Sequence, residues 1–180
     1  MNHIVIIGFM GAGKTKVGKR LAKDLGLPYV DLDKLIVSKM KMPISELFKR
    51  FGEPFYRATE TFIVKALIDD PERKVITLGS GCPVQPQNEE YIPKLGTVVY
   101  LKGSPEVIIE RIKEKDGNPI EREETTEERL IRKIETRNPI YSGISTFSVN
   151  IANTSLDDLV AKIEKKISDI EKKELKKAHK

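Results

Sequence analysis

The chain opens with a short run of mostly β-branched residues, 4–7, that ends in glycine. Such a run is typical of a buried strand. Between 14 and 25 the apolar positions Val17, Leu21 and Leu25 recur every four residues, as on one face of a helix, and a glycine follows directly. The pattern therefore predicts a strand, a glycine-rich loop and a helix at the start of the chain.

The same alternation of apolar runs and helical periods continues along the rest of the chain. Pro43 and the turn residues 69–71 separate helical segments, and Ser104 before Pro105 is a typical helix start. The pattern predicts strands at 4–7, 29–31, 75–78, 97–101 and 147–151, and helices at 14–25, 36–40, 44–51, 56–68, from 104–105 onward, at 127–135 and at 156–170. Strands that alternate with helices predict an α/β fold, a three-layer sandwich in which about five parallel strands carry helices on both faces.

The 180 residues contain no internal repeat and no linker, and they suffice for one domain with a sizeable core. We expect a single domain over residues 1–170 and a basic tail at 171–180. Residues 114–126, EKDGNPIEREETT, are polar and nearly free of core residues. A polar segment of this kind inside a compact domain is typical of a lid, which we place at about 113–126.

Composition indicates an ordinary soluble protein, with 39% hydrophobic and 33% charged residues. No apolar run approaches the roughly 18 residues that span a bilayer. The single cysteine, Cys82, excludes an intramolecular disulfide and suits a reducing compartment. We expect a cytoplasmic monomer with no membrane partner, and we interpret Cys82 as a packing residue rather than a nucleophile.

The net charge of +5 could suggest a nucleic-acid partner, but the charge is concentrated at one end. Residues 162–180 hold eight lysines and four acidic residues, and they account for +4 of the total. Mixed Glu and Lys on a helix usually form a solvated face, and no aromatic residues stand between these lysines as they would in a nucleic-acid surface. We therefore expect no nucleic-acid partner.

Residues 8–15, GFMGAGKT, match the phosphate-loop pattern G-x-x-x-x-G-K-[ST] in full. Glycines let such a loop turn its backbone N–H groups toward phosphate oxygens, and the following helix adds the positive end of its dipole. Lys14 supplies a cation for the β- and γ-phosphates, and the Thr15 hydroxyl is a magnesium ligand. The pattern predicts that ATP and Mg²⁺ are bound by Gly11, Ala12, Gly13, Lys14, Thr15 and Lys16.

Two aspartates, Asp31 and Asp33, end the second predicted strand, where the carboxyl ends of parallel strands gather ligands. Strand alternation would place both on one side, with Leu32 turned the other way. One carboxylate could hold magnesium and the other could accept a hydrogen bond from an attacking hydroxyl. The structural alternative is that Asp33 only caps a helix.

With these motifs in place, residues 44–48, ISELF, and 52–60, GEPFYRATE, carry a family resemblance. Together with the phosphate loop and the Asp-x-Asp pair, the chain resembles the shikimate kinase family, whose pattern reads I-x-E-x-F, then G-E-x-x-F-R-x-x-E. The resemblance extends from the first strand to about Tyr141 and makes 32–61 the substrate-binding segment.

The resemblance implies a role for each matching residue. Arg57 corresponds to the arginine that clamps the substrate carboxylate, and Arg137, in RNPIY, to a second carboxylate partner. Asp33 corresponds to the aspartate that holds the ring hydroxyls and serves as base, and Asp31 to the aspartate linked to magnesium. Arg111 resembles an arginine that lies against the adenine. Independently of the family, two guanidinium groups suit an anionic acceptor, and Glu60 is spaced to hold Arg57 on one helix face.

The chain departs from the family pattern at two places. Gly79, Ser80 and Gly81 stand where the family has three glycines whose backbone reaches the substrate, so Ser80 adds bulk and restricts the backbone. In the lid, Asn118 takes the place of an arginine that reaches the transferred phosphoryl group. Arg122 is the nearest replacement, and we expect it to be catalytic together with Lys14 and Asp33.

The resulting hypothesis is an ATP-dependent kinase that phosphorylates the 3-hydroxyl of shikimate, in aromatic amino-acid biosynthesis. The alternative is a related phosphate-loop kinase that acts on another small polyhydroxy acid, which the changes at Ser80 and Asn118 would permit. A guanine-nucleotide switch is disfavoured, because the chain has no N-K-x-D signature and no D-x-x-G after a strand.

Overall fold

A computed structural model describes residues 3–113 and 127–178 of the chain. In chain order its elements are β1 (His3–Ile7), α1 (Lys14–Leu25), β2 (Tyr29–Asp31), α2 (Leu32–Met40), α3 (Ile44–Ile68), β3 (Val75–Thr77), α4 (Pro86–Leu95), β4 (Gly96–Lys102), α5 (Pro105–Lys113), α6 (Glu127–Ile144), β5 (Phe147–Asn150) and α7 (Leu156–Ala178). The predicted lid, with Asn118 and Arg122, lies outside these residues.

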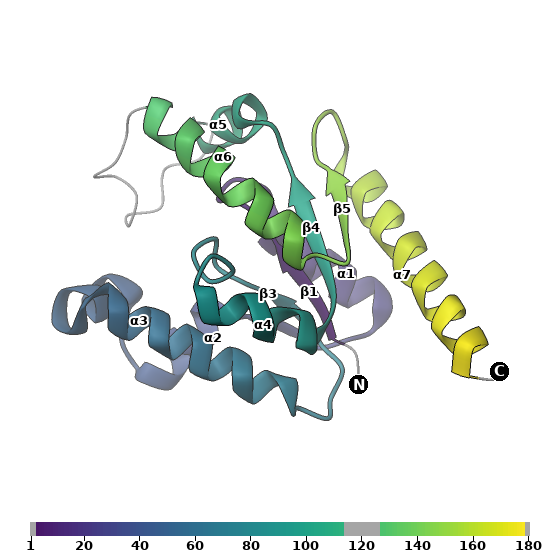
Figure 1. The fold of residues 1–180 in the computed structure, drawn as a ribbon, viewed down its shortest axis with the longest axis horizontal. Helices are drawn as coiled ribbons and strands as arrows, with labels where there is room; N and C mark the ends of the chain where they lie inside the picture. The colour runs from purple at the N-terminus through teal and green to yellow at the C-terminus, as the bar shows by residue number, and fades with distance from the viewer. Residues whose placement is uncertain (1–2, 114–126, 179–180) are drawn as a thin grey trace.

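The five strands form one parallel sheet in the order β2-β3-β1-β4-β5. Helices α1 and α7 pack together on one face, and α4 and α6 cover the other (Figure 1). The central strand β1 is completely buried, as its β-branched run predicts. The predicted three-layer α/β fold is therefore confirmed.

The order of the strands creates a crevice at the carboxyl ends of the two inner strands β1 and β3. The chain leaves β1 through α1 on one face to reach β2, and it leaves β3 through α4 on the other face to reach β4. Because adjacent strands β1 and β3 send their connections in opposite directions, their carboxyl ends flank a gap, which is where open α/β sheets bind ligands.

Three helices differ from their predictions. Helix α4 was not predicted, since Pro86–Leu95 contains two prolines and few apolar residues; packing of Ile92 and Leu95 into the core stabilises it. The predicted break between the helices 44–51 and 56–68 is present inside α3, as a kink at Gly52, where φ is 80° and the backbone is not helical. Helix α2 begins at Leu32 rather than 36, and α6 continues through Pro139 to Ile144.

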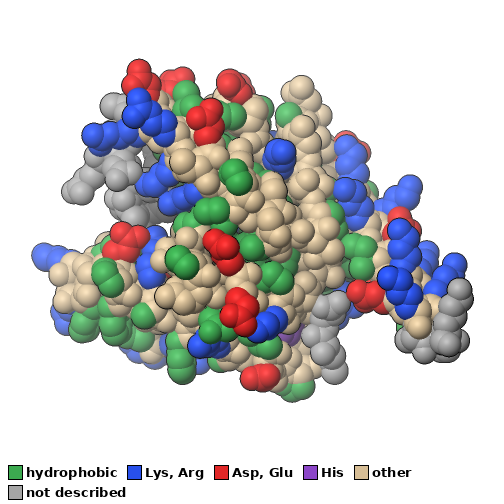
Figure 2. Space-filling model, viewed as in Figure 1, with side chains coloured by type: hydrophobic (Ala, Val, Ile, Leu, Met, Phe, Trp, Pro, Cys, Tyr) green, Lys and Arg blue, Asp and Glu red, His purple; other side chains and the backbone are tan. Residues whose placement is uncertain are grey.

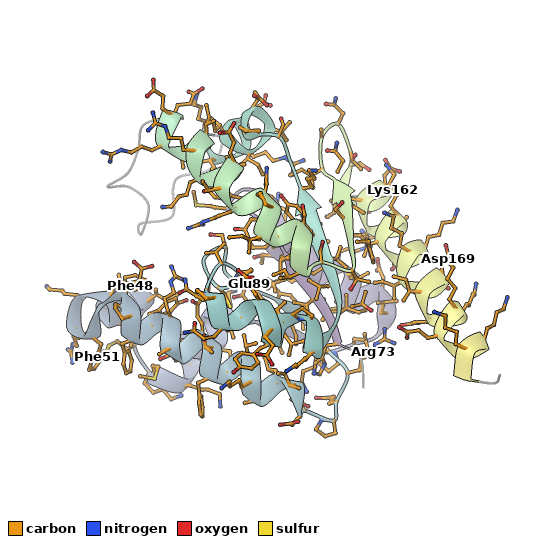
Figure 3. The ribbon with its side chains drawn as sticks, in the orientation of Figure 1. Phe48, Phe51, Arg73, Glu89, Lys162 and Asp169 are labelled. Carbon is orange, nitrogen blue, oxygen red and sulfur yellow. The ribbon has the colours of Figure 1, made fainter. Side chains whose placement is uncertain are left out.

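The last helix, α7, packs one face on the sheet and presents the other to solvent. Its core residues are Leu159, Val160, Ile163 and Ile167, all within the predicted helix 156–170. Lysine side chains gather along the outer side (Figure 2), and Lys162 and Asp169 both lie on exposed positions there (Figure 3). The helix continues to Ala178, so the tail segment is helical as far as the structure describes it. No helix within residues 3–113 and 127–178 has the length and apolar character needed to cross a membrane.

Candidate active site

The phosphate loop connects β1 to α1 in the conformation its glycines predict. Gly11 and Gly13 have φ of 80° and 92°, a region that side chains rarely adopt. Gly13 is the N-cap of α1, and the first turn of that helix has no acidic residue to compensate its positive end. The Lys14 ammonium group donates to the carbonyl oxygens of Gly8 (2.9 Å) and Phe9 (3.0 Å), so it folds back over the loop. The loop thus combines converging N–H groups with a cation, which suits a polyphosphate.

Beside the loop lies a cavity of about 200 Å³ that gathers most of the predicted site residues. Its lining comes from the phosphate loop and from the carboxyl ends of β2 and β3: Met10, Gly11, Gly13, Lys14, Thr15, Lys16, Asp31, Asp33, Thr77, Leu78, Gly79 and Ser80. These residues are far apart in sequence, and the crevice between β1 and β3 brings them together.

Asp31 and Asp33 both line this cavity, while Leu32 between them is fully buried. The expectation that both aspartates end a strand is wrong in detail, because β2 ends at Asp31 and Asp33 lies in the first turn of α2. Asp31, not Asp33, is the helix cap: its Oδ1 accepts from the Lys34 N–H at 3.3 Å. Its Oδ2 accepts from the Tyr29 hydroxyl at 3.3 Å.

Asp33 is held by groups from two other segments. The Tyr56 hydroxyl donates to Asp33 Oδ1 at 2.8 Å, and the backbone of Gly79 lies so close that a Cβ there would be 2.8 Å from the same oxygen. Burial raises the pKa of the Asp33 carboxyl group, and the Tyr56 hydrogen bond and the charges of Lys14 and Arg57 oppose this in part. A carboxylate with a raised pKa is a better proton acceptor than an exposed aspartate.

Arg57 is fixed by two glutamates on its own helix. Its Nη1 donates to Glu60 Oε2 at 2.8 Å, and its Nε and Nη2 donate to Glu53 Oε1 at 3.0 and 2.8 Å. The predicted support of Arg57 by Glu60 is therefore present. Burial disfavours the Arg57 charge, but Glu60 and Glu53 outweigh it, so the pKa of the guanidinium group lies above its usual value. Burial also raises the pKa of Glu60 to about 7, against the opposing charge of Arg57.

The guanidinium group of Arg57 packs against the backbone of Gly81, in the segment that follows β3. A Cβ on Gly81 would be 2.5 Å from both Nη1 and Nη2 of Arg57. Gly79 lies against Asp33 and Gly81 lies against Arg57. One glycine-containing segment therefore places a carboxylate and a guanidinium group near each other. The charge of Arg57 acts on Asp33, as does that of Lys14.

Arg137 approaches the same region from α6. Its guanidinium carbon lies 5.4 Å from the centre of the Phe9 ring, over the phosphate loop. One helical turn later, the Tyr141 hydroxyl donates to the Ser80 carbonyl oxygen at 2.7 Å. Arg137 Nη1 is buried and has no hydrogen-bond partner among the described residues. A buried guanidinium N–H without a partner is unusual, and an anionic ligand would satisfy it.

Arg111 lies on the opposite side of the phosphate loop. Its Nη2 donates to the Ile151 carbonyl oxygen at 2.8 Å, and its Nη1 is 3.5 Å from the Ala12 carbonyl oxygen. A second cavity of about 220 Å³ lies here, and its lining includes the remaining loop position Ala12 as well as Gly13, Lys16, Arg111 and Thr154. The two cavities share the loop, so a nucleotide could extend from one to the other.

Sequence reasoning missed the hydroxyl groups that support the acidic pair. Tyr29 contacts Asp31 and also Thr77, with 2.8 Å between the two hydroxyl oxygens, and Tyr56 contacts Asp33. The sequence contains a signal for the contact of Tyr29 with Asp31, because the two residues are two positions apart and so lie on one face of the strand. Tyr56 gave no local signal, since its contact with Asp33 bridges 23 positions.

The site combines a phosphate loop, between a central parallel strand and a helix, with a cavity lined by two aspartates and two lysines; Arg57 lies outside that lining, against Gly81. These features define a phosphate-loop kinase of small molecules. The family model "Shikimate kinase" matches residues 10–168. The chain therefore belongs to the shikimate kinase family.

Individual relatives agree with this assignment. A shikimate kinase of Thermodesulfovibrio yellowstonii is 37% identical over 91% of this chain and 93% of its own length, and one of Geobacter metallireducens is 34% identical over 91% and 90%. The solved structure of shikimate kinase from Acinetobacter baumannii in complex with shikimate superimposes with a TM-score of 0.82 at 31% identity, covering 94% of each chain. A gluconokinase from Sinorhizobium meliloti, at 19% identity and a TM-score of 0.59, shares the fold alone.

Proposed function

We propose that this chain transfers the γ-phosphoryl group of ATP to the 3-hydroxyl of shikimate, giving shikimate 3-phosphate and ADP in aromatic amino-acid biosynthesis. The observation that carries the proposal is that Asp33 lies against Gly79 and Arg57 lies against Gly81, while the charge of Lys14 acts on Asp33. This arrangement puts a proton acceptor and a carboxylate-binding cation beside a triphosphate loop. A phosphoryl acceptor that has both a hydroxyl and a carboxylate group fits this arrangement.

The nucleotide would occupy the two cavities that share the phosphate loop. Backbone N–H groups of residues 11–15 and the Lys14 ammonium group bind the phosphates, and Lys16 lines both cavities. Arg111, anchored by the Ile151 carbonyl oxygen, presents its planar group beside the place for the base.

Thr15 and Asp31 are the residues that fit a magnesium ion. Both line the same cavity and both offer hard oxygen donors. Within residues 3–113 and 127–178 no cluster of three or more His, Cys, Asp or Glu side chains could hold a metal ion. Two protein donors suffice for Mg²⁺, since it usually takes its other ligands from water and phosphates. When bound, the ion would neutralise phosphate charge.

The acceptor would be oriented by Arg57 and Arg137 through its carboxylate, and the backbone of residues 79–81 would border its ring. The acceptor hydroxyl oxygen attacks the γ-phosphorus, the bond to the β-phosphate oxygen breaks, and the proton passes to Asp33. Catalysis then consists of positioning and of charge stabilisation by Lys14. We assign to Arg122 the second positive charge at the transferred group; it belongs to the segment outside the described residues.

An acceptor panel tests the proposal directly. Release of ADP is followed in a coupled assay with shikimate, with gluconate and with other polyhydroxy acids of similar size. Shikimate should exceed every other acceptor in kcat/KM by orders of magnitude. A different preferred acid would favour the alternative kinase, for which the serine at position 80 in the cavity lining is the supporting observation.

We also infer that the enzyme works as a cytoplasmic monomer. Cys82, the only cysteine, is fully buried and unpaired, which suits a reducing compartment. Gel filtration with light scattering should give a mass near 20.4 kDa. A mass twice as large would contradict the monomer.

A further inference from the structure

Tyr56 lies directly behind the Asp33 carboxyl group and has no role in the mechanism above. Its side chain is 3% exposed, and its ring packs against that of Phe48 with 5.0 Å between the centroids. Both residues belong to α3, on which Figure 3 labels Phe48. The Tyr56 hydroxyl donates to Asp33 Oδ1 at 2.8 Å. A buried tyrosine hydroxyl needs a partner, and here the partner is the proposed proton acceptor.

The Asp33 carboxyl group is restrained from several directions. The Gly79 backbone blocks one side, because a Cβ there would lie 2.8 Å from Oδ1 and 3.2 Å from Oδ2. Leu32, the preceding residue, is fully buried and anchors the start of α2. The Tyr56 hydroxyl then commits Oδ1 to a hydrogen bond. The rotation of the carboxyl group is thereby set, and Oδ2 becomes the oxygen for an acceptor hydroxyl.

The hydroxyl of Tyr56 is separable from the packing of its ring. The family pattern quoted above, G-E-x-x-F-R, has phenylalanine at this position, where this chain has tyrosine. A phenyl ring would fill the same space against Phe48. The hydroxyl group therefore adds a contact to Asp33 that packing does not require.

We propose that Tyr56 is a positioning residue for phosphoryl transfer: its hydroxyl holds the Asp33 carboxylate so that Oδ2 meets the acceptor hydroxyl. This inference rests on the proposed function, in which Asp33 is the proton acceptor. It predicts that loss of the hydroxyl affects the chemical step rather than the binding of either substrate, because the hydroxyl contacts Asp33. The ring, whose centroid lies 5.4 Å from the guanidinium carbon of Arg57, is kept in a phenylalanine.

The test compares Tyr56→Phe with the wild type and with Tyr91→Phe, a matched loss of a hydroxyl on α4, away from the site. In Tyr56→Phe the kcat should fall by about tenfold, as expected when a hydrogen bond to a charged group is lost. The KM for shikimate and for ATP should stay within about twofold of the wild-type values. Tyr91→Phe should leave kcat and both KM values unchanged. Thermal unfolding establishes that each variant is folded at the assay temperature.

An unchanged kcat in Tyr56→Phe would overturn the inference while the proposed function stands. So would a rise in the KM for shikimate at constant kcat, because Tyr56 would then bind the acceptor itself. If the wild type does not phosphorylate shikimate, the proposed function fails, and the contact of the Tyr56 hydroxyl with Asp33 is then tested by itself, without turnover. The ¹³C signal of the Asp33 carboxyl carbon, assigned by its loss in Asp33→Asn, should move in Tyr56→Phe and not in Tyr91→Phe. A signal that does not move would overturn it.

Discussion

Replacement of Arg57 by alanine separates acceptor binding from nucleotide binding. The guanidinium group has five N–H donors, and its hydrogen bonds to Glu53 and Glu60 use three of them. Two donors remain, one on each Nη, and donors on both Nη atoms can bind a carboxylate with two bonds. A hydrogen bond to a charged group contributes about 1.5–3 kcal/mol, so two such bonds amount to roughly 3 kcal/mol or more. The KM for shikimate should therefore rise by about 10²-fold in Arg57→Ala.

Nucleotide affinity should be nearly unchanged, because Arg57 is not part of the lining of either cavity at the phosphate loop. Initial rates at varied shikimate give the first quantity, and calorimetric titration with an ATP analogue gives the second. Arg57→Lys is the matched control: it keeps the charge and loses the paired Nη donors, so its KM should lie between those of the wild type and the alanine variant. Equal weakening of both substrates in Arg57→Ala would refute the assigned role, and so would an unchanged KM for shikimate.

Three further predictions follow from the same contacts. Lys14→Ala should lower kcat by about 10³-fold in the coupled assay, because a cation at the transferred phosphoryl group is lost; an active variant would contradict this. The carboxyl group of Glu60, with a pKa raised to about 7, binds a proton more readily in the folded than in the unfolded chain, so wild-type stability should fall by about 3 kcal/mol as pH rises from about 4.5 to about 7. Urea unfolding should show this contribution absent in Glu60→Gln, and equal pH slopes in both proteins would exclude it. Deletion of residues 171–180 should leave kcat intact and lower the free energy of unfolding by about 1 kcal/mol at most, since it removes the partly exposed ion pair Arg73–Glu171; lost activity would give the tail a role in the site.

The elements with strong local signals could be predicted from the sequence alone. The helix Lys14–Leu25 begins after Gly13 and ends before Gly26, as its period and glycines indicate. Strands β1, β3 and β4 gave the strongest signals, because parallel strands buried on both faces are largely continuous apolar runs. The edge strands β2 and β5 are only partly buried, and their signals were weaker. Helix α4 had no such signal, because its formation depends on packing of Ile92 and Leu95 that only the folded sheet provides.

The residues of the candidate site likewise fall into those with a local sequence signal and those without one. The phosphate loop and Asp31-x-Asp33 are local patterns, and their grouping follows from the rule that carboxyl ends of strands meet at one edge. Contacts that bridge long stretches of chain could not be read from spacing. His3 is an example: it is fully buried, with Nε2 donating to the Leu67 carbonyl oxygen at 2.8 Å and Nδ1 accepting from the Lys74 N–H at 3.2 Å.

The segment Gly79-Ser80-Gly81 explains how the chain tolerates a serine among glycines. Close approach requires glycine on both sides, since a Cβ at position 79 would clash with Asp33 and one at position 81 with Arg57. Position 80 has no such constraint: Ser80 lines the cavity, its φ is not positive, and Tyr141 holds its carbonyl oxygen at 2.7 Å. Ser80 therefore needs no positive φ of the kind that favours glycine, and its side chain adds bulk and a hydroxyl to the cavity lining. Since the close contacts to Asp33 and Arg57 come from the flanking glycines, we expect the serine to change the wall of the pocket and not the positions of these two side chains.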